Sequence, residues 1–509
     1  MTLVHGYFSG QGYTFGAYGE QSPERLAFVA LLRSQRPPDL AGPFQMLDIG
    51  CGQGFNLCLQ AATYPQARFT GIDINSDHIA HARSLARAAG LENVSFLEGD
   101  FLSIEAQFSE RWEQFDFAVA HGILGWVNPD VGEAMLRLAA RALRPGGLFY
   151  ISYDTFPGWL PMVPFQQAVR SFQHRLPDGL PSLQAAIALF RELRDSQAQV
   201  FPAQPALSGR LDGIDNLDPA YLLHEYNHQQ WQPQFSNDVI RKARLQGFHY
   251  LGSANLAENF DGLLPQPFRQ TLQNQPDEEL RELARDLLLN QSFRRDVYAK
   301  GRDPIWALEA SSAVRSLKIL RLVGDAPLNE ENAFQFSLSS GEVQGRPERF
   351  RQLVESLGEA PISIEDVLKA NPETPEIPEL LQNITLLLTK GWVCLVPPDR
   401  DLGPAQRFNA FVAASVADGG PYRALSAPVS GNLHQLNDID LIALHAHLQG
   451  WPMEDLSQII QTNLKLLGRS IKRDGQPLSD EALSEELATR VNNFSGTLLP
   501  LLRRLGVLA

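Results

Sequence analysis

The order of apolar segments between residues 44 and 153 restricts the fold of this chain more than any other feature. Five short apolar runs alternate with segments of helical periodicity near residues 55–63, 76–89 and 130–143; the runs are FQMLDIG, ARFTGIDI, NVSFLEGD, FDFAVAHGIL and GGLFYISY. Strands and helices that alternate at this spacing are typical of βαβ units. We therefore predict an α/β domain with a mostly parallel sheet and helices on both faces.

A glycine-rich turn joins the first of these strands to the first helix. In MLDIGCGQGFN the glycines Gly50, Gly52 and Gly54 have the spacing G-x-G-x-G. Such a turn lets the backbone approach a ligand closely and places helix N–H groups beside it. The dinucleotide fingerprint G-x-G-x-x-G would need glycine where Phe55 stands, which disfavours NAD. Asp48, just before the turn, suits a ligand that carries an ammonium or sulfonium group.

Further polar and aromatic residues follow the next strands. Asp73, with Ile74, closes the second strand about 20 residues past the glycines, where a carboxylate can accept hydrogen bonds from both ribose hydroxyls. Asp100 and Phe101 end the third strand and could hold an adenine. The fourth strand leads to His121 and Trp126 at the carboxyl edge of the sheet, where open α/β sheets bind ligands.

Taken together and in this order, these elements resemble the class I S-adenosylmethionine-dependent methyltransferases. The resemblance implies a Rossmann-like core that binds S-adenosylmethionine, releases S-adenosylhomocysteine and needs no metal. The cofactor-binding residues that it implies are Asp48, Gly50, Gly52, Gly54, Asp73, Ile74, Asp100, Phe101, His121 and Tyr18.

The rest of the chain narrows the resemblance. AHGILGWV and ISYDTFPGW follow the fourth and fifth strands, YLLHEYN occupies 221–227, and NQSFRRDVYAKG occupies 290–301. These stretches resemble a bacterial family typified by the rickettsial protein lysine methyltransferases, in which a methyltransferase regulatory domain follows the core. The chain departs from this family at Asp154, where asparagine is usual.

The resemblance and the breaks in the pattern predict six segments. They are an N-terminal aromatic and helical lid (1–40), the cofactor-binding core (41–158), a helix and linker (159–217), a regulatory-type middle domain (218–305), a winged-helix-like module (306–400) and a mainly helical C-terminal domain (401–509). We read the middle domain as mostly helical.

The string His224-Glu225-Tyr226-Asn227-His228 also spells the zinc-protease signature H-E-x-x-H. The extended signature would need Gly at Trp231 and His at Gln234, and neither is present. The string falls within the stretch that resembles the regulatory domain. We therefore predict no metal, and expect His224 and Glu225 to make structural or interdomain hydrogen bonds.

Composition restricts the partners. The formal net charge is −15, and no segment concentrates Lys and Arg, so nucleic acid is a poor candidate. The stretch SIEDVLKANPETPEIPELLQ is acidic where a DNA-recognition helix should be basic. Three cysteines without a C-x-x-C pair, no signal-peptide pattern and no long apolar run predict a reduced cytoplasmic protein without a membrane association. The oligomeric state stays open, with a homodimer as one option.

For catalysis we expect His121, Tyr153 and Asp154 near the transferred methyl group, and Trp126, Trp159 and Tyr13 along an acceptor channel. Three readings remain: methylation of protein lysines, methylation of a small molecule with the C-terminal half as accessory structure, and a S-adenosylmethionine-binding regulator without turnover. The length of chain outside the core favours a macromolecular acceptor.

Overall fold

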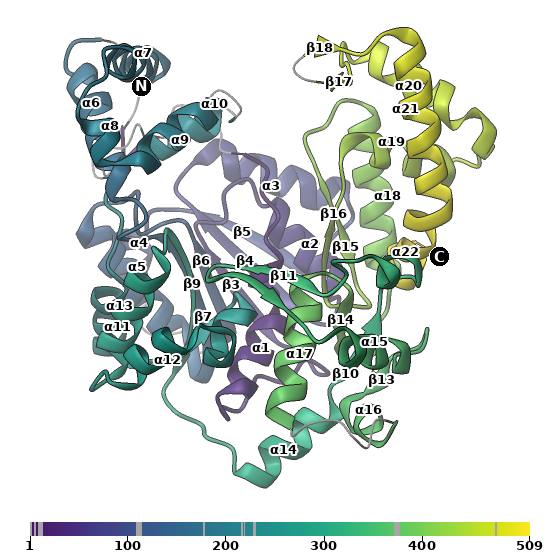
Figure 1. Ribbon diagram of the computed structural model, residues 1–509, viewed down its shortest axis with the longest axis horizontal. Helices are drawn as coiled ribbons and strands as arrows, with labels where there is room; N and C mark the ends of the chain where they lie inside the picture. Colours follow the sequence, from purple (N-terminus) through teal and green to yellow (C-terminus); the bar gives the residue numbers. More distant parts are fainter. Residues whose placement is uncertain are drawn as a thin grey trace.

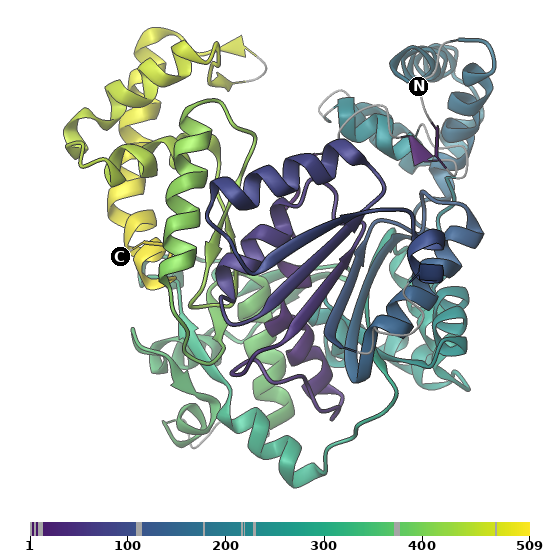
Figure 2. The same cartoon turned by 180° about the vertical axis from the view of Figure 1, so that it is seen from behind.

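The computed structural model describes residues 3–4, 7–8, 14–107, 114–176, 179–214, 217, 219–226, 231–370, 377–473 and 476–508. A seven-stranded sheet with the order β5-β4-β3-β6-β7-β9-β8 lies at its centre (Figure 1). Smaller groups of helices and hairpins surround this sheet, and Figure 2 shows its strands from behind.

Five strands of the sheet are parallel and confirm the predicted α/β core. They are β3 (Gln45–Ile49), β4 (Arg68–Asp73), β5 (Val94–Glu98), β6 (Phe115–His121) and β7 (Leu143–Asp154). In space the third, second, first, fourth and fifth strands follow one another, so the strand order reverses between β3 and β6. At such a point the loops after the strands diverge, and a crevice opens at the carboxyl ends.

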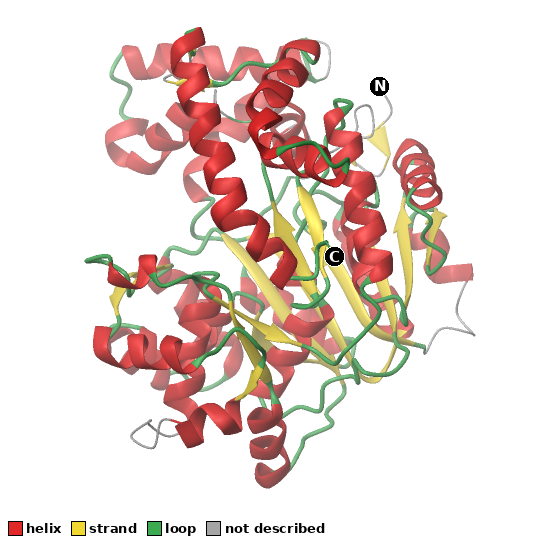
Figure 3. Ribbon diagram, turned by 90° about the vertical axis from the view of Figure 1, so that its right-hand side faces the viewer, coloured by secondary structure: helices red, strands yellow, loops and turns green. Residues whose placement is uncertain are grey.

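Helices cover both faces of the sheet. One face packs on α1 (Pro23–Leu32), α2 (Phe55–Thr63) and α3 (Ser76–Ala88). The other packs on α4 (Phe101–Gln107), α5 (Pro129–Ala142) and α11 (Ser236–Leu245). Figure 3 shows strands in yellow between helices in red. The apolar residues of the parallel strands are buried on both sides, which explains why they read as continuous apolar runs.

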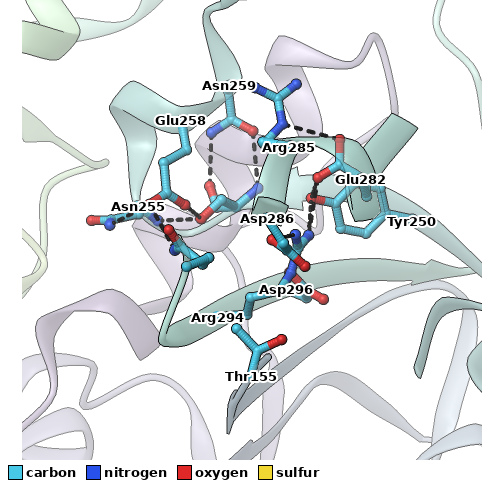
Figure 4. A network of polar contacts seen from close by, with 12 residues as sticks. Thr155, Tyr250, Asn255, Glu258, Asn259, Glu282, Arg285, Asp286, Arg294 and Asp296 are labelled. Carbon is cyan, nitrogen blue, oxygen red and sulfur yellow. Dashed lines mark hydrogen bonds and ion pairs between the residues drawn. The ribbon is translucent and has the colours of Figure 1, made fainter. Parts of the chain in front are cut away.

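The middle segment differs from the mostly helical reading, because it adds two strands to the sheet. Strand β9 (Phe293–Lys300) pairs antiparallel with β7, and β8 (Phe248–Ser253) pairs antiparallel with β9. Helices α12 (Gln266–Gln273) and α13 (Glu278–Leu289) lie between them in the chain. The stretch FRRDVYAK does not have the sequence pattern of a strand, because charged residues occupy its buried face. Arg294 and Asp296 are buried there in ion pairs (Figure 4).

Residues between the core and the middle segment form a helical lobe instead of a helix and a linker. Its helices are α6 (Val163–Gln173), α7 (Leu180–Asp195), α8 (Val200–Ala203) and α9 (Pro205–Gly213), and α10 (Pro219–Tyr226), the first helix of the middle segment, packs with them. Pro205 lies in the segment that we predict to be a helix and linker. It stands at the start of α9, where its missing N–H and its fixed φ suit the first turn of a helix. The lobe has its own apolar core around Phe165 and Phe190.

The segment after the middle domain contains three helices followed by a strand. These are α15 (Pro347–Ser356), α16 (Ile364–Ala370), α17 (Ile377–Thr389) and β14 (Val393–Val396). Strand β10 (Lys318–Arg321), which follows α14 (Ala307–Ser316), pairs with β14 and with β13 (Ile362–Ser363), and a hairpin of β11 (Gln335–Leu338) and β12 (Gly341–Gln344) precedes α15. A winged-helix relationship stays a prediction.

The C-terminal region is mainly helical, as expected, and packs against the core. It comprises α18 (Gly403–Ala417), the hairpin β15 (Ala424–Ala427) and β16 (Asn432–Gln435), α19 (Asp438–Leu448), α20 (Leu456–Leu466), α21 (Asp480–Asn493) and α22 (Leu499–Arg504). Phe55 of α2 stacks on Tyr422 with ring centroids 4.6 Å apart. In the described parts of the chain, we find no helix that is long and apolar enough to cross a membrane.

Candidate active site

A cavity of about 600 Å³ lies at the carboxyl ends of the parallel strands. Its wall combines the loops after those strands with the N-terminal residues 14–21, the α9–α10 part of the helical lobe, and the start of β9. Cavities of roughly 300–1,000 Å³ are usual for cofactor and small-molecule sites. Four parts of the chain that are far apart in sequence therefore build one site.

The glycine turn provides backbone at the cavity wall. Gly50, Gly52 and Gly54 have positive φ angles of 85°, 52° and 75°. A Cβ on Gly50 would lie 2.4 Å from Cδ1 of Ile123, and one on Gly54 would lie 2.5 Å from Cβ of Ala82. A Cβ on Gly52 would meet nothing within 4 Å. The outer glycines are thus needed for packing, whereas Gly52 leaves room for a ligand against the backbone.

Two carboxylates stand beside this turn. Burial, together with the negative charge of Asp73, raises the pKa of Asp48 to about 7. No hydrogen bond from the described residues supports the Asp48 carboxylate, so a cationic ligand would relieve its burial. Asp73 is anchored instead: its Oδ2 accepts from the N–H of Gly52 (2.9 Å) and its Oδ1 from the N–H of Asn75 (2.9 Å).

The end of the third strand forms the next part of the wall. Asp100 and Phe101 both line the cavity, as does Ile74. Asp100 also starts α4, because its Oδ1 accepts hydrogen bonds from the N–H groups of Leu102 (2.9 Å) and Ser103 (3.1 Å). The ring of Phe101 offers an apolar face, which an adenine requires.

His121, at the end of β6, lines the cavity. The Tyr18 ring stacks on its imidazole at 3.9 Å, and its Nδ1 lies 2.9 Å from Oγ of Ser152. Burial, with a smaller contribution from Arg295, lowers the pKa of His121 to about 4, although Glu20 acts in the opposite direction. The ring is therefore neutral and a weak base at pH 7, which suits a wall that positions ligands better than a proton acceptor.

The end of β7 faces a second carboxylate. Asp154 and Glu225 of α10 both line the cavity. Burial, together with the charge of Glu225, holds the pKa of Asp154 well above its usual range. Burial also raises the pKa of Glu225, although hydrogen bonds, including one from Nε1 of Trp231 at 3.0 Å, oppose this. Both shifts favour a state in which the two carboxyl groups share one proton.

Aromatic side chains surround this pair. Trp126 and Trp159, which we expect along an acceptor channel, line the cavity together with Tyr221. The Arg210 guanidinium lies 4.2 Å from the ring centroid of Trp159. Tyr13, the third residue of the expected acceptor channel, lies outside the described residues.

Tyr153 is the one predicted catalytic residue that the structure keeps away from the cavity. Successive side chains of a strand point to opposite faces, so Tyr153 and Asp154 diverge. The Tyr153 side chain is fully buried, and its hydroxyl donates to Oδ2 of Asp296 at 2.6 Å. We therefore give Tyr153 a structural role in place of the catalytic one.

Sequence reasoning missed several residues of the cavity wall. They are Glu20, Arg210, Tyr221, Glu225, Phe293 and Arg295. Two signals pointed to some of them, because the HEY and FRR stretches contain Glu225, Phe293 and Arg295, but we read the first only as a structural helix. His224 of the H-E-x-x-H string is buried, whereas His228 lies outside the described residues. The described residues contain no cluster of three metal-ligating side chains.

The C-terminal region supports the cofactor side of the cavity from behind. The imidazole of His81 connects the C-terminal region to the glycine turn. Its Nδ1 lies 2.9 Å from the carbonyl oxygen of Gln53 in the turn, and its Nε2 lies 3.0 Å from the Tyr422 hydroxyl. Asn432 donates to the carbonyl oxygen of Gly19 at 3.0 Å. The hairpin β15–β16 thus holds the N-terminal segment that closes the cavity.

The strand order, the glycine turn and the acidic residues at the ends of β3 and β4 define the class I fold of S-adenosylmethionine-dependent methyltransferases. Residues 43–188 match the family described as "Methyltransferase domain", and residues 218–300 match the "Predicted methyltransferase regulatory domain". The chain is therefore a S-adenosylmethionine-dependent methyltransferase in which a catalytic domain is joined to a methyltransferase regulatory domain.

Several known proteins are similar to this chain. An uncharacterised protein of Synechocystis sp. is 29% identical over 517 residues, which cover 100% of both chains. An uncharacterised protein of Rickettsia prowazekii is 27% identical over 282 residues, 54% of this chain and 49% of that protein. The structure of PKMT2 from Rickettsia typhi in complex with AdoHcy superposes with a TM-score of 0.69 at 20% identity, over 97% of this chain and 98% of that one. This likeness shows a common fold.

Proposed function

We propose that the protein transfers methyl groups from S-adenosylmethionine to lysine side chains of a protein acceptor. The observation that carries this proposal is the carboxyl pair Asp154–Glu225, buried among aromatic rings at the end of β7. A primary amine arrives as an ammonium ion, and such a pair suits it both as a binding partner and as a proton acceptor.

The charge of the pair favours an amine over a neutral acceptor. When they share one proton, Asp154 and Glu225 together carry a single negative charge. An ammonium ion between Trp126 and Trp159 would gain both this charge and cation–π attraction. A neutral hydroxyl acceptor would gain neither.

The same pair solves the proton problem of the reaction. An ammonium ion has no lone pair, so the acceptor must lose a proton before it can attack. A buried carboxylate with a raised pKa is a stronger base than an exposed one, so Asp154–Glu225 can take this proton. The bound cofactor supplies a sulfonium-activated methyl carbon, whose bond to sulfur breaks as the new carbon–nitrogen bond forms. Positioning by the aromatic wall and exclusion of water complete the contribution of the protein.

Two features support a macromolecular acceptor. The helical lobe that borders the acceptor end of the cavity exposes large apolar side chains, at Leu160 (51%), Val163 (41%), Leu176 (38%) and Leu180 (41%). These side chains lie around the two ends of α6 and at the start of α7, and exposed apolar side chains suit the docking of a protein. The second feature is the fold shared with the rickettsial protein lysine methyltransferase PKMT2 along nearly the whole chain.

The test is transfer of labelled methyl groups from S-adenosylmethionine into an extract of the source organism. Labelled proteins would be separated from small molecules and hydrolysed to amino acids, and we expect the label in methylated lysine. The double variant Asp154→Asn/Glu225→Gln should lower this incorporation about 100-fold or more while it still binds S-adenosylhomocysteine. Asp399→Asn, which removes an exposed carboxylate, is the matched control and should leave incorporation unchanged.

The other two readings give different results. Label confined to small molecules would refute a protein acceptor and make the C-terminal half accessory. Label in protein but in a residue other than lysine would refute lysine specificity. Tight cofactor binding without labelled product, in extracts from several growth conditions, would favour a regulator without turnover.

A further inference from the structure

Neighbouring arginines of β9 point to opposite faces of the sheet. Arg294 is buried and makes ion pairs with Glu282, Asp286 and Asp296, as Figure 4 shows. Arg295, the next residue, lines the cavity instead. The regulatory domain thus fixes one arginine inside the fold and presents the other to the active site.

Of the three guanidinium nitrogens of Arg295, only Nε is hydrogen-bonded to a residue that the structure describes. Its Nε donates to Oε1 of Glu20 at 2.8 Å, and its guanidinium carbon lies 4.8 Å from the Phe293 ring centroid. Its two terminal amino groups donate no hydrogen bond to any residue that the structure describes. The side chains of Arg295 and Glu20 are 31% and 19% exposed, so both reach the cavity.

The position of this ion pair restricts what it can bind. Of the described residues that line the cavity, only Arg210 and Arg295 are arginines, and no lysine is among them. Arg210 lies over Trp159 at the acceptor end. Arg295 lies on the cofactor side, because it is bonded to Glu20, and the segment that holds Glu20 is tied to the residues just after the glycine turn by the hydrogen bond from Tyr18 N–H to Oδ1 of Asn56 at 2.9 Å. The cofactor side thus has a guanidinium and a carboxylate next to each other.

We infer that Arg295 and Glu20 bind the amino-acid end of the cofactor, the carboxylate at Arg295 and the ammonium at Glu20. A planar guanidinium with two open amino groups can bind a carboxylate through two parallel hydrogen bonds. The pKa of Glu20 lies below its usual value despite burial, because His121 and Arg295 favour its charged form, so the carboxylate is available to an ammonium ion. Opposite charges side by side match an α-amino acid and no other part of the cofactor.

This assignment gives the regulatory domain a direct part in cofactor binding. The methyltransferase domain supplies the turn and the acidic residues for the adenosine half. Strand β9, which belongs to the matched regulatory domain, supplies the charge for the amino-acid half. The inference concerns the cofactor side of the cavity and does not depend on the acceptor proposed above.

Calorimetric titration with two ligands tests the assignment. S-Adenosylhomocysteine has the amino-acid end, whereas 5′-methylthioadenosine lacks it. We expect Arg295→Gln and Glu20→Gln each to weaken S-adenosylhomocysteine binding about tenfold or more, while the affinity for 5′-methylthioadenosine changes less than about twofold. Arg295→Lys should recover part of the loss, because it keeps the charge but not the bidentate geometry. Arg302→Gln removes an exposed arginine and serves as the control.

A second measurement starts from the unmodified protein, so its first comparison requires no variant. The unmodified protein should bind decarboxylated S-adenosylmethionine at least about tenfold more weakly than S-adenosylmethionine, and Arg295→Gln should remove most of this difference. Equal losses for both ligands in Arg295→Gln, unchanged S-adenosylhomocysteine affinity, or equal affinity of the unmodified protein for the decarboxylated cofactor would each overturn the inference.

Discussion

Replacing Arg294 by methionine tests whether the buried ion pairs under β9 hold the regulatory domain on the sheet. Arg294 is 5% exposed, and its three nitrogens lie 3.0 Å from Oε2 of Glu282, 2.6 Å from Oδ1 of Asp286 and 2.9 Å from Oδ1 of Asp296. Methionine fills a similar volume but removes the only cation that joins these three carboxylates.

The size of the effect follows from what each carboxylate keeps. Glu282 retains Arg285, at 3.3 Å, and Asp296 retains hydrogen bonds from two tyrosine hydroxyls. Asp286 loses most when the arginine is removed, because its Oδ2 already lacks a hydrogen-bond partner among the described residues. Breaking a buried ion pair on one side costs about 3–5 kcal/mol. For a cooperative unit of roughly 150–250 residues, this loss lowers Tm by about 6–20 °C.

Differential scanning calorimetry of Arg294→Met and Arg295→Met gives the comparison. These neighbouring substitutions remove the same charge from the same strand, but we expect only Arg294→Met to lower Tm by this amount. Arg295→Met should mainly weaken S-adenosylhomocysteine binding. Burial already raises the pKa of Asp286 in the folded protein, and in Arg294→Met the loss of the arginine charge raises it further. The folded state then binds a proton more readily than the unfolded chain does. The stability of the variant therefore falls as pH rises. The Tm difference from the unmodified protein should therefore be larger at pH 8 than at pH 5. Equal Tm values for both variants at pH 8 would refute the reasoning.

Three further predictions concern the cofactor side. Because the pKa of Asp48 is about 7, its carboxyl group loses its proton as pH increases through 7, and the affinity for S-adenosylmethionine should rise. Titrations at pH 6 and 8 measure this rise, and Asp48→Asn should not show it. Gly54→Ala places a Cβ 2.5 Å from a neighbouring alanine and should lower the free energy of unfolding by about 1–3 kcal/mol. Gly52→Ala should lower the affinity for S-adenosylhomocysteine with a smaller change in Tm. The opposite pattern would contradict the roles that we give to these glycines. Tyr422→Ala removes the ring stack on Phe55 and should lower both Tm and cofactor affinity, and an unchanged affinity would show that the C-terminal region does not support the turn.

The cofactor half of the site could be predicted because its residues are local. Asp48 and the three glycines belong to one strand and one turn, and Asp73 ends the next strand, so their spacing alone brings them to the same edge of a parallel sheet. The half that we propose for the acceptor could be predicted only in part. Asp154 ends a strand of the core, but its partner Glu225 lies on a helix about 70 residues further along the chain, and no spacing rule links the two.

Strand β9 shows the physical limit most clearly. A strand is recognised from sequence by apolar side chains on its buried face, and β9 buries Arg294 and Asp296 there instead. Such charges are tolerated only because carboxylates and hydroxyls from other segments surround them, and a local pattern holds no information about those segments. Tyr153 illustrates the same point within the core, because its hydroxyl is occupied by a residue of β9.

By itself, the sequence determined the parallel core, the glycine turn and the class of cofactor, since each depends on residues that are neighbours along the chain. Only the tertiary structure decided that the regulatory domain completes the sheet, that Glu225 joins Asp154, and that Arg295 meets Glu20. These contacts join segments up to 275 residues apart, and they form only when the burial of apolar surface has already brought those segments together.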